Sequence, residues 1–318
     1  MSANTMDTTP AARRALGSTG LLVSPLCVGG AEFGSVPVLG YDVPEDRALA
    51  TLRAVFESPI NFLDTGASYG QGESERRIGM ALRELGGLPP GFVLATKADR
   101  DPGTGDFSAD QVRRSVGRSL RLLGRDRLQL VYLHDPEYAA QSFEQIVGPG
   151  GAVDALLGLK SEGIIDHVGI ASGPTELVMR YVETDVFEVA LSHNRYTLLD
   201  RSAEPLFDVA AQHGVAVMNA APYGGGLLVK GPQAVPRYMY RPASADLLGR
   251  AERMAQVCDR YGIPLAAAAL QFSLRQPRIT STVVGFSHPE RVAQTIRLAT
   301  TDIPDGLWQE LDMLAGAS

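Results

Sequence analysis

The stretch Asn61–Leu82, NFLDTGASYGQGESERRIGMAL, contains an apolar run, an acid, a tyrosine and a helix start in close succession. Its first residues predict the end of a strand, and the glycines that follow predict a loop before a helix capped by Ser74. Asp64 then lies where a strand stops, and Tyr69 lies on the loop. Taken alone, the stretch favours a structural interpretation, with Asp64 as a turn acid and Tyr69 as an amphipathic surface residue. The rest of the chain decides between a structural and a catalytic role for these two residues.

The same alternation of a short apolar run and a helical period repeats along the chain after a predicted hairpin over residues 13–23. Strands are expected at 26–28, 61–63, 92–96, 128–133, 168–170, 187–191, 215–218 and 281–284. Helices are expected at 44–58, 74–85, 109–123, 152–161, 174–182, 204–212, 247–261, 265–274, from 289 onward, and at 307–314.

Strands that alternate with helices indicate a parallel sheet, and this number of units predicts an α/β protein with a closed (β/α)8 TIM barrel. We expect one barrel domain over residues 13–318 behind a flexible tail at 1–12. An open doubly wound sheet is the alternative. However, no predicted strand is followed by the glycine fingerprint of that fold's dinucleotide site, and Gly224–Gly226 alone is too short a motif to indicate phosphate binding.

Composition and charge narrow the classes of partner. The net charge of −7 gives no basic field for nucleic acid or an anionic membrane. The arginines between positions 113 and 127 alternate with apolar residues, as on a solvated helix face. Cys27 and Cys258 lie far apart in apolar runs, which indicates free thiols in a reducing compartment. With no long apolar run and no signal-peptide core at 1–10, we expect a cytoplasmic protein.

Three polar residues end successive predicted strands. Asp64 ends the second strand, Lys97 ends the third and His134 ends the fourth. Each could be structural on its own, but in a barrel the carboxyl ends of the strands form the active site. Together with Tyr69 they therefore predict a catalytic group.

This group suits proton transfer to or from an oxygen. A lysine ammonium beside a tyrosine lowers the pKa of the phenol, an aspartate can hold the lysine, and a histidine can orient the substrate oxygen. No member is a good nucleophile or electron sink, so a bound redox cofactor is expected. A metal site built on His134 and His193 lacks a third ligand at a recognisable spacing, so no metal is expected.

At this point the chain resembles the aldo-keto reductase family. The likeness is carried by FLDTGASYGQGESERRIG, LATK, VYLHDP, GIIDHVGIAS and APYGGGLL, and it runs from about Arg14 to Trp308. It implies a (β/α)8 barrel, a nicotinamide cofactor (NAD or NADP) bound across the carboxyl face, and a small-molecule substrate. It also implies Tyr69 as the general acid or base, supported by Asp64, Lys97 and His134.

The resemblance further implies a set of cofactor-binding positions: Gly30, Ser172, His193, Ala220, Ala221, Gly226, Gly285, Ser287, Arg291, Gln294 and Thr295. Four of them depart from the commoner family pattern. Ser172 stands in place of an asparagine, His193 in place of a glutamine, and Ala220 in place of a tyrosine that stacks on the nicotinamide. Gly285 stands where a lysine meets the 2′-phosphate of NADP, so we expect NAD to serve at least as well as NADP.

A closer likeness, through NRYTLLD, SAEPLF, YMYRPAS and AAAALQFSLRQP, is to the branch that contains D-threo-aldose (L-fucose) 1-dehydrogenases and pyridoxal 4-dehydrogenase. Their substrates can present a cyclic hemiacetal, whose oxidation gives a lactone. The resemblance leaves open a general aldehyde or ketone reductase and a non-catalytic, cofactor-binding regulatory subunit. Loops near Glu32, Phe33, Tyr138 and 237–241 are expected to line the substrate pocket.

Overall fold

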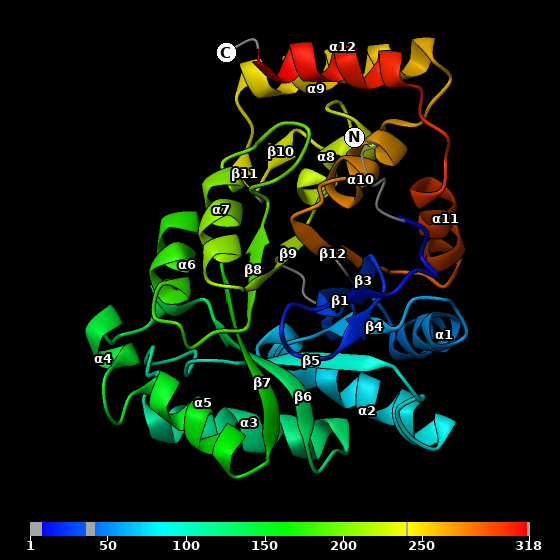
Figure 1. The fold of residues 1–318 in the computed structure, drawn as a ribbon. Coiled ribbons are helices and arrows are strands. Elements are labelled where there is room, and N and C mark those ends of the chain that lie inside the picture. Colours follow the sequence, from blue (N-terminus) through cyan, green and yellow to red (C-terminus); the bar gives the residue numbers. More distant parts are fainter. Residues whose placement is uncertain (1–7, 36–41, 240, 317–318) are drawn as a thin grey trace.

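The computed structural model describes residues 8–35, 42–239 and 241–316, and its centre is a closed barrel of parallel strands (Figure 1). Neighbours around the barrel follow the order β12-β3-β4-β5-β6-β7-β8-β9. The barrel strands are β3 (Leu26–Gly29), β4 (Phe62–Asp64), β5 (Val93–Ala98), β6 (Leu128–His134), β7 (Ile165–Ser172), β8 (Val189–His193), β9 (Ala216–Ala220) and β12 (Ile279–Gly285). The predicted (β/α)8 barrel is confirmed.

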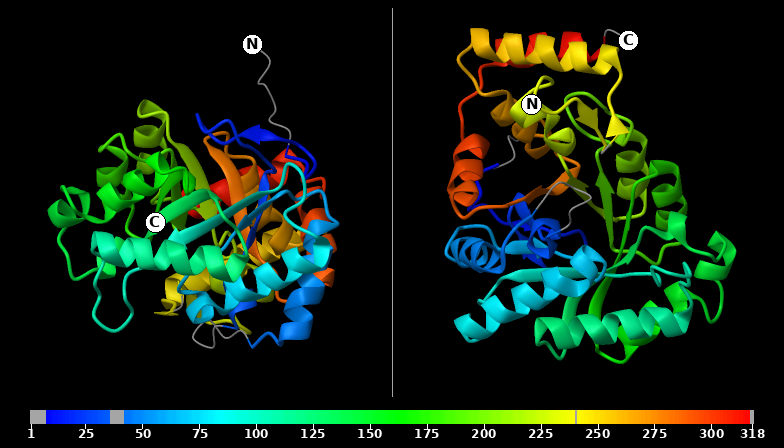
Figure 2. Two further views of the ribbon diagram at one scale, coloured as in Figure 1. Left: turned by 90° about the horizontal axis from the view of Figure 1, so that it is seen from below. Right: turned by 180° about the vertical axis from the view of Figure 1, so that it is seen from behind.

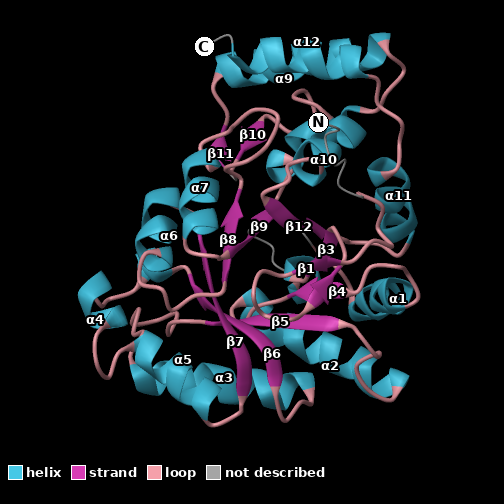
Figure 3. Cartoon of the chain, viewed as in Figure 1, coloured by secondary structure: helices cyan, strands magenta, loops and turns pink. Residues whose placement is uncertain are grey.

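Helices surround the barrel on its outside (Figure 3). They are α1 (Glu45–Phe56), α2 (Glu73–Leu85), α3 (Ala109–Leu123), α4 (Phe143–Val147), α5 (Ala152–Ser161), α6 (Thr175–Val182), α7 (Glu204–Gln212), α8 (Leu227–Lys230), α9 (Ala245–Arg260), α10 (Leu265–Leu274), α11 (Glu290–Ala299) and α12 (Asp305–Gly316). Helices α9 and α12 lie side by side beyond the barrel wall in both the front and back views (Figure 1, Figure 2).

Alternation of side chains along the strands separates two apolar cores. Phe62, Val93 and Leu130 point into the barrel, where they belong to a compact interior cluster. Their neighbours Leu63 and Leu94 point outward and pack under the helices. Because successive strand side chains face opposite sides, every second residue after an inward one also faces the barrel axis.

A short hairpin made of β1 (Arg14–Ala15) and β2 (Leu22–Val23) precedes the barrel, as predicted. Its residues Leu16 and Val23 are fully buried and join the interior cluster. Gly17, at φ +57°, lies against Ala216 at the start of β9. The hairpin therefore packs at the amino ends of the strands, opposite the carboxyl ends that carry the predicted catalytic residues.

The predicted N-cap of α2, Ser74, is wrong, because the N-cap is Gly72, two residues earlier. Helix α2 begins at Glu73 behind Gly72, whose φ of 93° makes the turn into the helix. The hydroxyl of Ser74 is buried, donates to the carbonyl of Gly30 at 2.7 Å, and shares a hydrogen bond with the hydroxyl of Thr65 at 2.8 Å. It therefore ties α2 to the loops after β3 and β4 instead of capping the helix.

The other predicted boundaries lie within two residues of the observed ones, except that β7 (Ile165–Ser172) begins three residues before the predicted strand 168–170. Helix α3 begins behind Ser108, whose hydroxyl accepts a hydrogen bond from the amide of Gln111 as an N-cap does. Helix α4 and the short strands β10 (Arg237–Tyr238) and β11 (Arg241–Pro242) were not predicted. Residues 1–7 of the predicted tail lie outside the described residues. Among the helices of the described chain, none is both long and apolar enough to cross a membrane.

Candidate active site

Strand alternation brings three of the four predicted catalytic residues to one end of the barrel. Each of the three lies two residues after an inward-facing side chain on its strand, so it also faces inward. The pairs are Phe62 and Asp64 on β4, Ala95 and Lys97 on β5, and Tyr132 and His134 on β6. Lys97 is the penultimate residue of β5 rather than the residue at which the strand ends. All three side chains line one cavity at the carboxyl ends of the strands.

Lys97 is held as a buried ammonium. Its side chain is 1% exposed, and its Nζ donates to Oδ2 of Asp64 and, at 2.6 Å, to the carbonyl of Thr65. Burial alone would lower the pKa of Lys97, but the carboxylate of Asp64 and the phenol of Tyr69 outweigh it and raise that pKa above its ordinary value. Lys97 is therefore a fixed positive charge at neutral pH.

Tyr69 reaches this group from a tight turn after β4. It opens the 3-10 turn Tyr69–Gly72, in which Gly70 has a φ of +59° and a Cβ would lie 2.0 Å from the carbonyl oxygen of Gly34. Only glycine fits there without a shift of the backbone. The Tyr69 ring centroid lies 4.8 Å from Nζ of Lys97, and 5.8 Å from the ring centroid of His134 at an interplanar angle of 87°. All four predicted residues therefore converge.

The protonation of Tyr69 differs from the sequence-based expectation. Burial raises the pKa of Tyr69 above its ordinary value, while the ammonium of Lys97 lowers it by a smaller amount. The direction of the Lys97 effect is as expected, but the net pKa is raised rather than lowered. The reason is that desolvation disfavours the phenolate more than one nearby cation favours it. Tyr69 therefore carries its proton at neutral pH in this structure.

Sequence reasoning missed Asp99, which holds His134 in place. The residue directly follows β5, and its Oδ1 lies 2.6 Å from Nδ1 of His134 while its Oδ2 accepts from the amide of Ser68 at 2.7 Å. Burial alone would lower the pKa of His134, but the carboxylates of Asp99 and Asp135 outweigh it and raise that pKa. The signal was available, because Asp99 continues the inward alternation of Ala95 and Lys97.

We expect Asp99→Asn to lower kcat/KM on the order of 10-fold, because it removes the carboxylate that orients His134 and favours its charged form. The pKa of His134, followed by NMR of the imidazole, should fall in this variant. Asp110→Asn, which removes an exposed carboxylate on α3, is the matched control and should leave both quantities unchanged. An unmoved His134 titration in Asp99→Asn would contradict this role.

Asp135 is a second carboxylate that sequence reasoning missed. It has a φ of 46°, a left-handed conformation that is uncommon for residues other than glycine. Its Oδ1 lies 3.7 Å from Nε2 of His134, on the side of the imidazole away from Asp99. Asp135 lines the cavity, so it presents a negative charge beside the nitrogen of His134 that faces the cavity.

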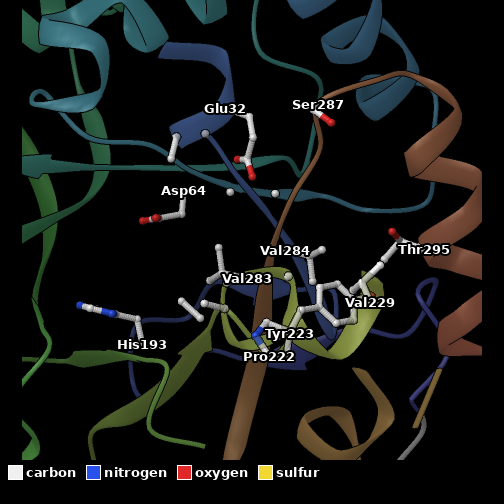
Figure 4. Close-up of a pocket in the computed structure, with 18 of the residues that line it drawn as sticks. Glu32, Asp64, His193, Pro222, Tyr223, Val229, Val283, Val284, Ser287 and Thr295 are labelled. Atoms are coloured by element: carbon white, nitrogen blue, oxygen red, sulfur yellow. The ribbon is translucent and has the colours of Figure 1, made fainter. Parts of the chain in front are cut away.

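The cavity has a volume of about 720 Å³, within the range of small-molecule sites. Figure 4 shows Asp64 and His193 at one end and Ser287 and Thr295 at the other. Ten of the eleven predicted cofactor positions line this cavity: Gly30, His193, Ala220, Ala221, Gly226, Gly285, Ser287, Arg291, Gln294 and Thr295. The structure thus brings together residues from β3, β8, β9, β12 and α11.

Ser172 is the predicted cofactor position that the structure does not bring to the cavity. It has the same strand parity as Ile170, whose side chain packs outward under the helices, whereas Ala171 lines the cavity. Its side chain is fully buried, and its hydroxyl donates to Oε2 of Glu137 at 2.9 Å. Oε1 of Glu137 accepts from the amide of Gly173 at 3.2 Å.

Only some of the residues expected to line the substrate pocket line the cavity in the structure. Glu32 and Arg237 line the cavity. Phe33 is fully buried in the outer core, and Tyr138 is 61% exposed on the 3-10 turn Pro136–Tyr138. Position 240 lies outside the described residues. Within the described chain, no group of three or more His, Cys, Asp or Glu side chains is placed to hold a metal ion.

Comparison with known proteins places this geometry in a family. The aldo/keto reductase family model matches residues 25–315. D-threo-aldose 1-dehydrogenase of a Pseudomonas species is 32% identical, over 96% of this chain and 97% of the relative. L-galactose dehydrogenase of Arabidopsis thaliana is 35% identical, over 93% and 91%. Pyridoxal 4-dehydrogenase of Microbacterium luteolum is 30% identical, over 94% and 96%.

A solved structure agrees with this assignment. An aldo-keto reductase from Bacillus halodurans, determined in its holo form, superposes with a TM-score of 0.77 at 26% identity and covers 96% of this chain and 97% of its own. The barrel, the matched residues and these relatives together show that the chain is an oxidoreductase of the aldo/keto reductase family.

Proposed function

We propose that this protein is an NAD(P)-dependent dehydrogenase that oxidises the cyclic hemiacetal of an aldose or a pyridoxal-like compound to a lactone. The observation that carries the proposal is the convergence of Tyr69, Lys97, Asp64 and His134 at one end of the cavity. The substrates named for the similar dehydrogenases of Pseudomonas, Arabidopsis and Microbacterium support the choice of substrate class.

The cavity fits a nicotinamide cofactor in two respects. Oδ1 of Asp64 is buried and has no hydrogen-bond partner among the described residues, so a ribose hydroxyl of the cofactor could satisfy it. The backbone at Gly226 has a φ of +99°, and a Cβ there would meet nothing within 4 Å, which leaves room for a phosphate to approach the chain. Arg291, Gln294 and Thr295 would then hold the adenosine end.

The reaction needs one hydride and one proton to leave the substrate. A nicotinamide cofactor held in this cavity would supply the acceptor for the hydride of the hemiacetal carbon. The hydroxyl on the same carbon loses its proton to Tyr69, and the carbon–oxygen double bond of the lactone forms. His134 binds that oxygen. Tyr69 accepts a proton only as a phenolate, and the ammonium of Lys97 stabilises that phenolate. The carboxylate of Asp135 would accept hydrogen bonds from further substrate hydroxyls.

A second candidate function has one observation in its favour. Because burial keeps the proton on Tyr69 at neutral pH, the phenol is ready to act as an acid, which is the role needed to reduce an aldehyde or ketone. We therefore expect the dehydrogenase rate to rise with pH. The regulatory-subunit alternative would show cofactor binding without turnover in either direction.

The test is a panel of aldoses, including L-galactose and L-fucose, together with pyridoxal, each assayed with NAD and with NADP by the absorbance of the reduced cofactor. We expect the rate of oxidation of at least one of these hemiacetals to exceed the rate at which the enzyme reduces aromatic aldehydes. Activity confined to the aldehydes would replace the proposal with the general reductase. Binding of either cofactor without any turnover would favour the regulatory subunit.

Cofactor choice gives a separate prediction. Arg291 lines the cavity and donates to Oε1 of Gln294 at 3.2 Å, whereas Gly285 offers no cation. One missing charge-assisted contact should cost NADP roughly 1.5–3 kcal/mol of binding free energy. We expect kcat/KM for NAD to equal or exceed that for NADP, and Arg291→Ala to lower the NADP value much more than the NAD value. A wild-type preference of a hundredfold for NADP would refute this interpretation.

A further inference from the structure

Glu32 is a buried carboxyl that the proposed reaction does not use. It lies on the 3-10 turn Ala31–Gly34 after β3, lines the cavity and is 9% exposed. Burial raises the pKa of Glu32 to about 7, and only its own backbone N–H offsets that effect. In the described part of the chain no side-chain hydrogen bond or ion pair engages its carboxyl group. A buried carboxyl without a cation is costly, which suggests that a ligand uses it.

The carboxyl of Glu32 lies against the end of β12. A Cβ placed on Gly285 would lie 1.8 Å from Oε1 and 2.2 Å from Cδ of Glu32. The Glu32 side chain therefore occupies the space that any side chain at position 285 would need. Figure 4 shows the Glu32 carboxyl pointing into the cavity between Asp64 and Ser287, between the catalytic end and the end that holds Thr295.

Arg291 and Glu32 both line the cavity, so two side chains of opposite charge face it. Arg291, on α11, favours an anion there, and Glu32, beside Gly285, disfavours one when it is ionised. Low-dielectric cavity walls strengthen both effects relative to water. A neutral diol gains a hydrogen-bond acceptor from the same carboxylate, which is how acidic residues hold the ribose of non-phosphorylated dinucleotides in other folds.

We propose that Glu32 determines cofactor specificity: its carboxylate beside Gly285 accepts hydrogen bonds from the ribose hydroxyls of NAD and repels the 2′-phosphate of NADP. This inference rests on the proposed nicotinamide-dependent function and names the residue that selects the cofactor. It predicts that neutralising Glu32 changes the affinities of two ligands unequally when those ligands differ only in the 2′-phosphate.

The test measures binding and does not depend on activity. Calorimetric affinities for ADP-ribose and for 2′-phospho-ADP-ribose are compared in the full-length wild type and in Glu32→Gln at pH 8, where the Glu32 carboxyl is ionised. We expect the wild type to favour ADP-ribose, and Glu32→Gln to narrow the ratio of the two affinities by about 10-fold. Glu290→Gln, an exposed carboxylate next to Arg291, makes the same change in net charge and should leave the ratio within about 2-fold. Glu32→Ala should narrow the ratio as Glu32→Gln does.

The outcomes are distinct. An equal gain for both ligands would show that Glu32 acts on the pyrophosphate they share and would overturn the proposal, as would an unchanged ratio in both Glu32 variants. If the wild type bound neither these fragments nor NAD nor NADP, the proposed function itself would fail. If the dinucleotides bound normally and their affinities did not depend on Glu32, only the role of Glu32 would be refuted.

Discussion

Tyr69→Phe is expected to lower turnover by at least ~10²-fold, within the range contributed by a general acid or base. The substitution keeps the aromatic ring, which packs 4.8 Å from Nζ of Lys97 and edge-on to the ring of His134, and it removes only the hydroxyl. Among the described residues that line this end of the cavity, no other phenol lies beside the Lys97 ammonium. The measurement is the steady-state kcat in both reaction directions.

Binding separates this effect from a loss of structure. NAD affinity, measured by calorimetry, should survive in Tyr69→Phe because the hydroxyl is not among the groups expected to hold the cofactor. Tyr261→Phe, on an exposed residue at the end of α9, removes a phenol that donates to Glu310 and should leave kcat unchanged. Near-wild-type turnover in Tyr69→Phe would remove Tyr69 from the mechanism.

Lys97→Met should lower turnover near neutral pH on the order of 10²-fold and shift the pH profile upward. The ammonium of Lys97 lowers the pKa of Tyr69, so its removal raises that pKa further above its ordinary value. In the oxidising direction Tyr69 must be deprotonated to accept a proton, so the remaining activity should appear only at more alkaline pH. The pH dependence of kcat/KM, compared with that of the wild type, measures the shift.

A loss of stability has to be separated from this effect. Removing Lys97 leaves Asp64 buried without its cation, and breaking a buried pair in this way costs about 3–5 kcal/mol. The double variant Asp64→Asn with Lys97→Met removes the unpaired charge, so it should recover thermal stability without recovering turnover. Lys160→Met, far from the cavity on α5 and paired with Glu188, is the control for loss of a lysine. An unshifted pH profile at a measurable rate would show that Lys97 does not tune Tyr69.

Strand periodicity made much of the site predictable. The apolar alternation that predicts β4, β5 and β6 also places Asp64, Lys97 and His134 on the inward face, because a strand repeats every second residue. The same rule would have excluded Ser172, which has the outward parity of Ile170, and would have included Asp99, which has the inward parity of Lys97. Ser172 was assigned by motif likeness rather than by strand face, and Asp99 lies outside the motifs that carry the family likeness.

Other features depend on contacts that no local pattern contains. The net pKa of Tyr69 is set by how completely the closed barrel desolvates the phenol, and burial is a property of the fold rather than of the stretch around Tyr69. Asp135 reaches the cavity through a left-handed backbone conformation that the sequence does not indicate. The contact between Glu32, on the turn after β3, and Gly285, at the end of β12, joins segments from opposite ends of the chain where these two strands pair.

The central claim is that a hydride leaves the hemiacetal carbon while Tyr69 takes the proton from its hydroxyl. It is tested most directly with L-galactose deuterated at its first carbon, incubated with NAD and with either the wild type or Tyr69→Phe. Mass spectrometry then follows the reduced cofactor, and trapping with hydroxylamine follows the lactone. We predict that the wild type yields deuterated reduced cofactor and trapped lactone in equal amounts, and that Tyr69→Phe yields neither at a comparable rate. Reduced cofactor without deuterium, or without the lactone, would contradict the account.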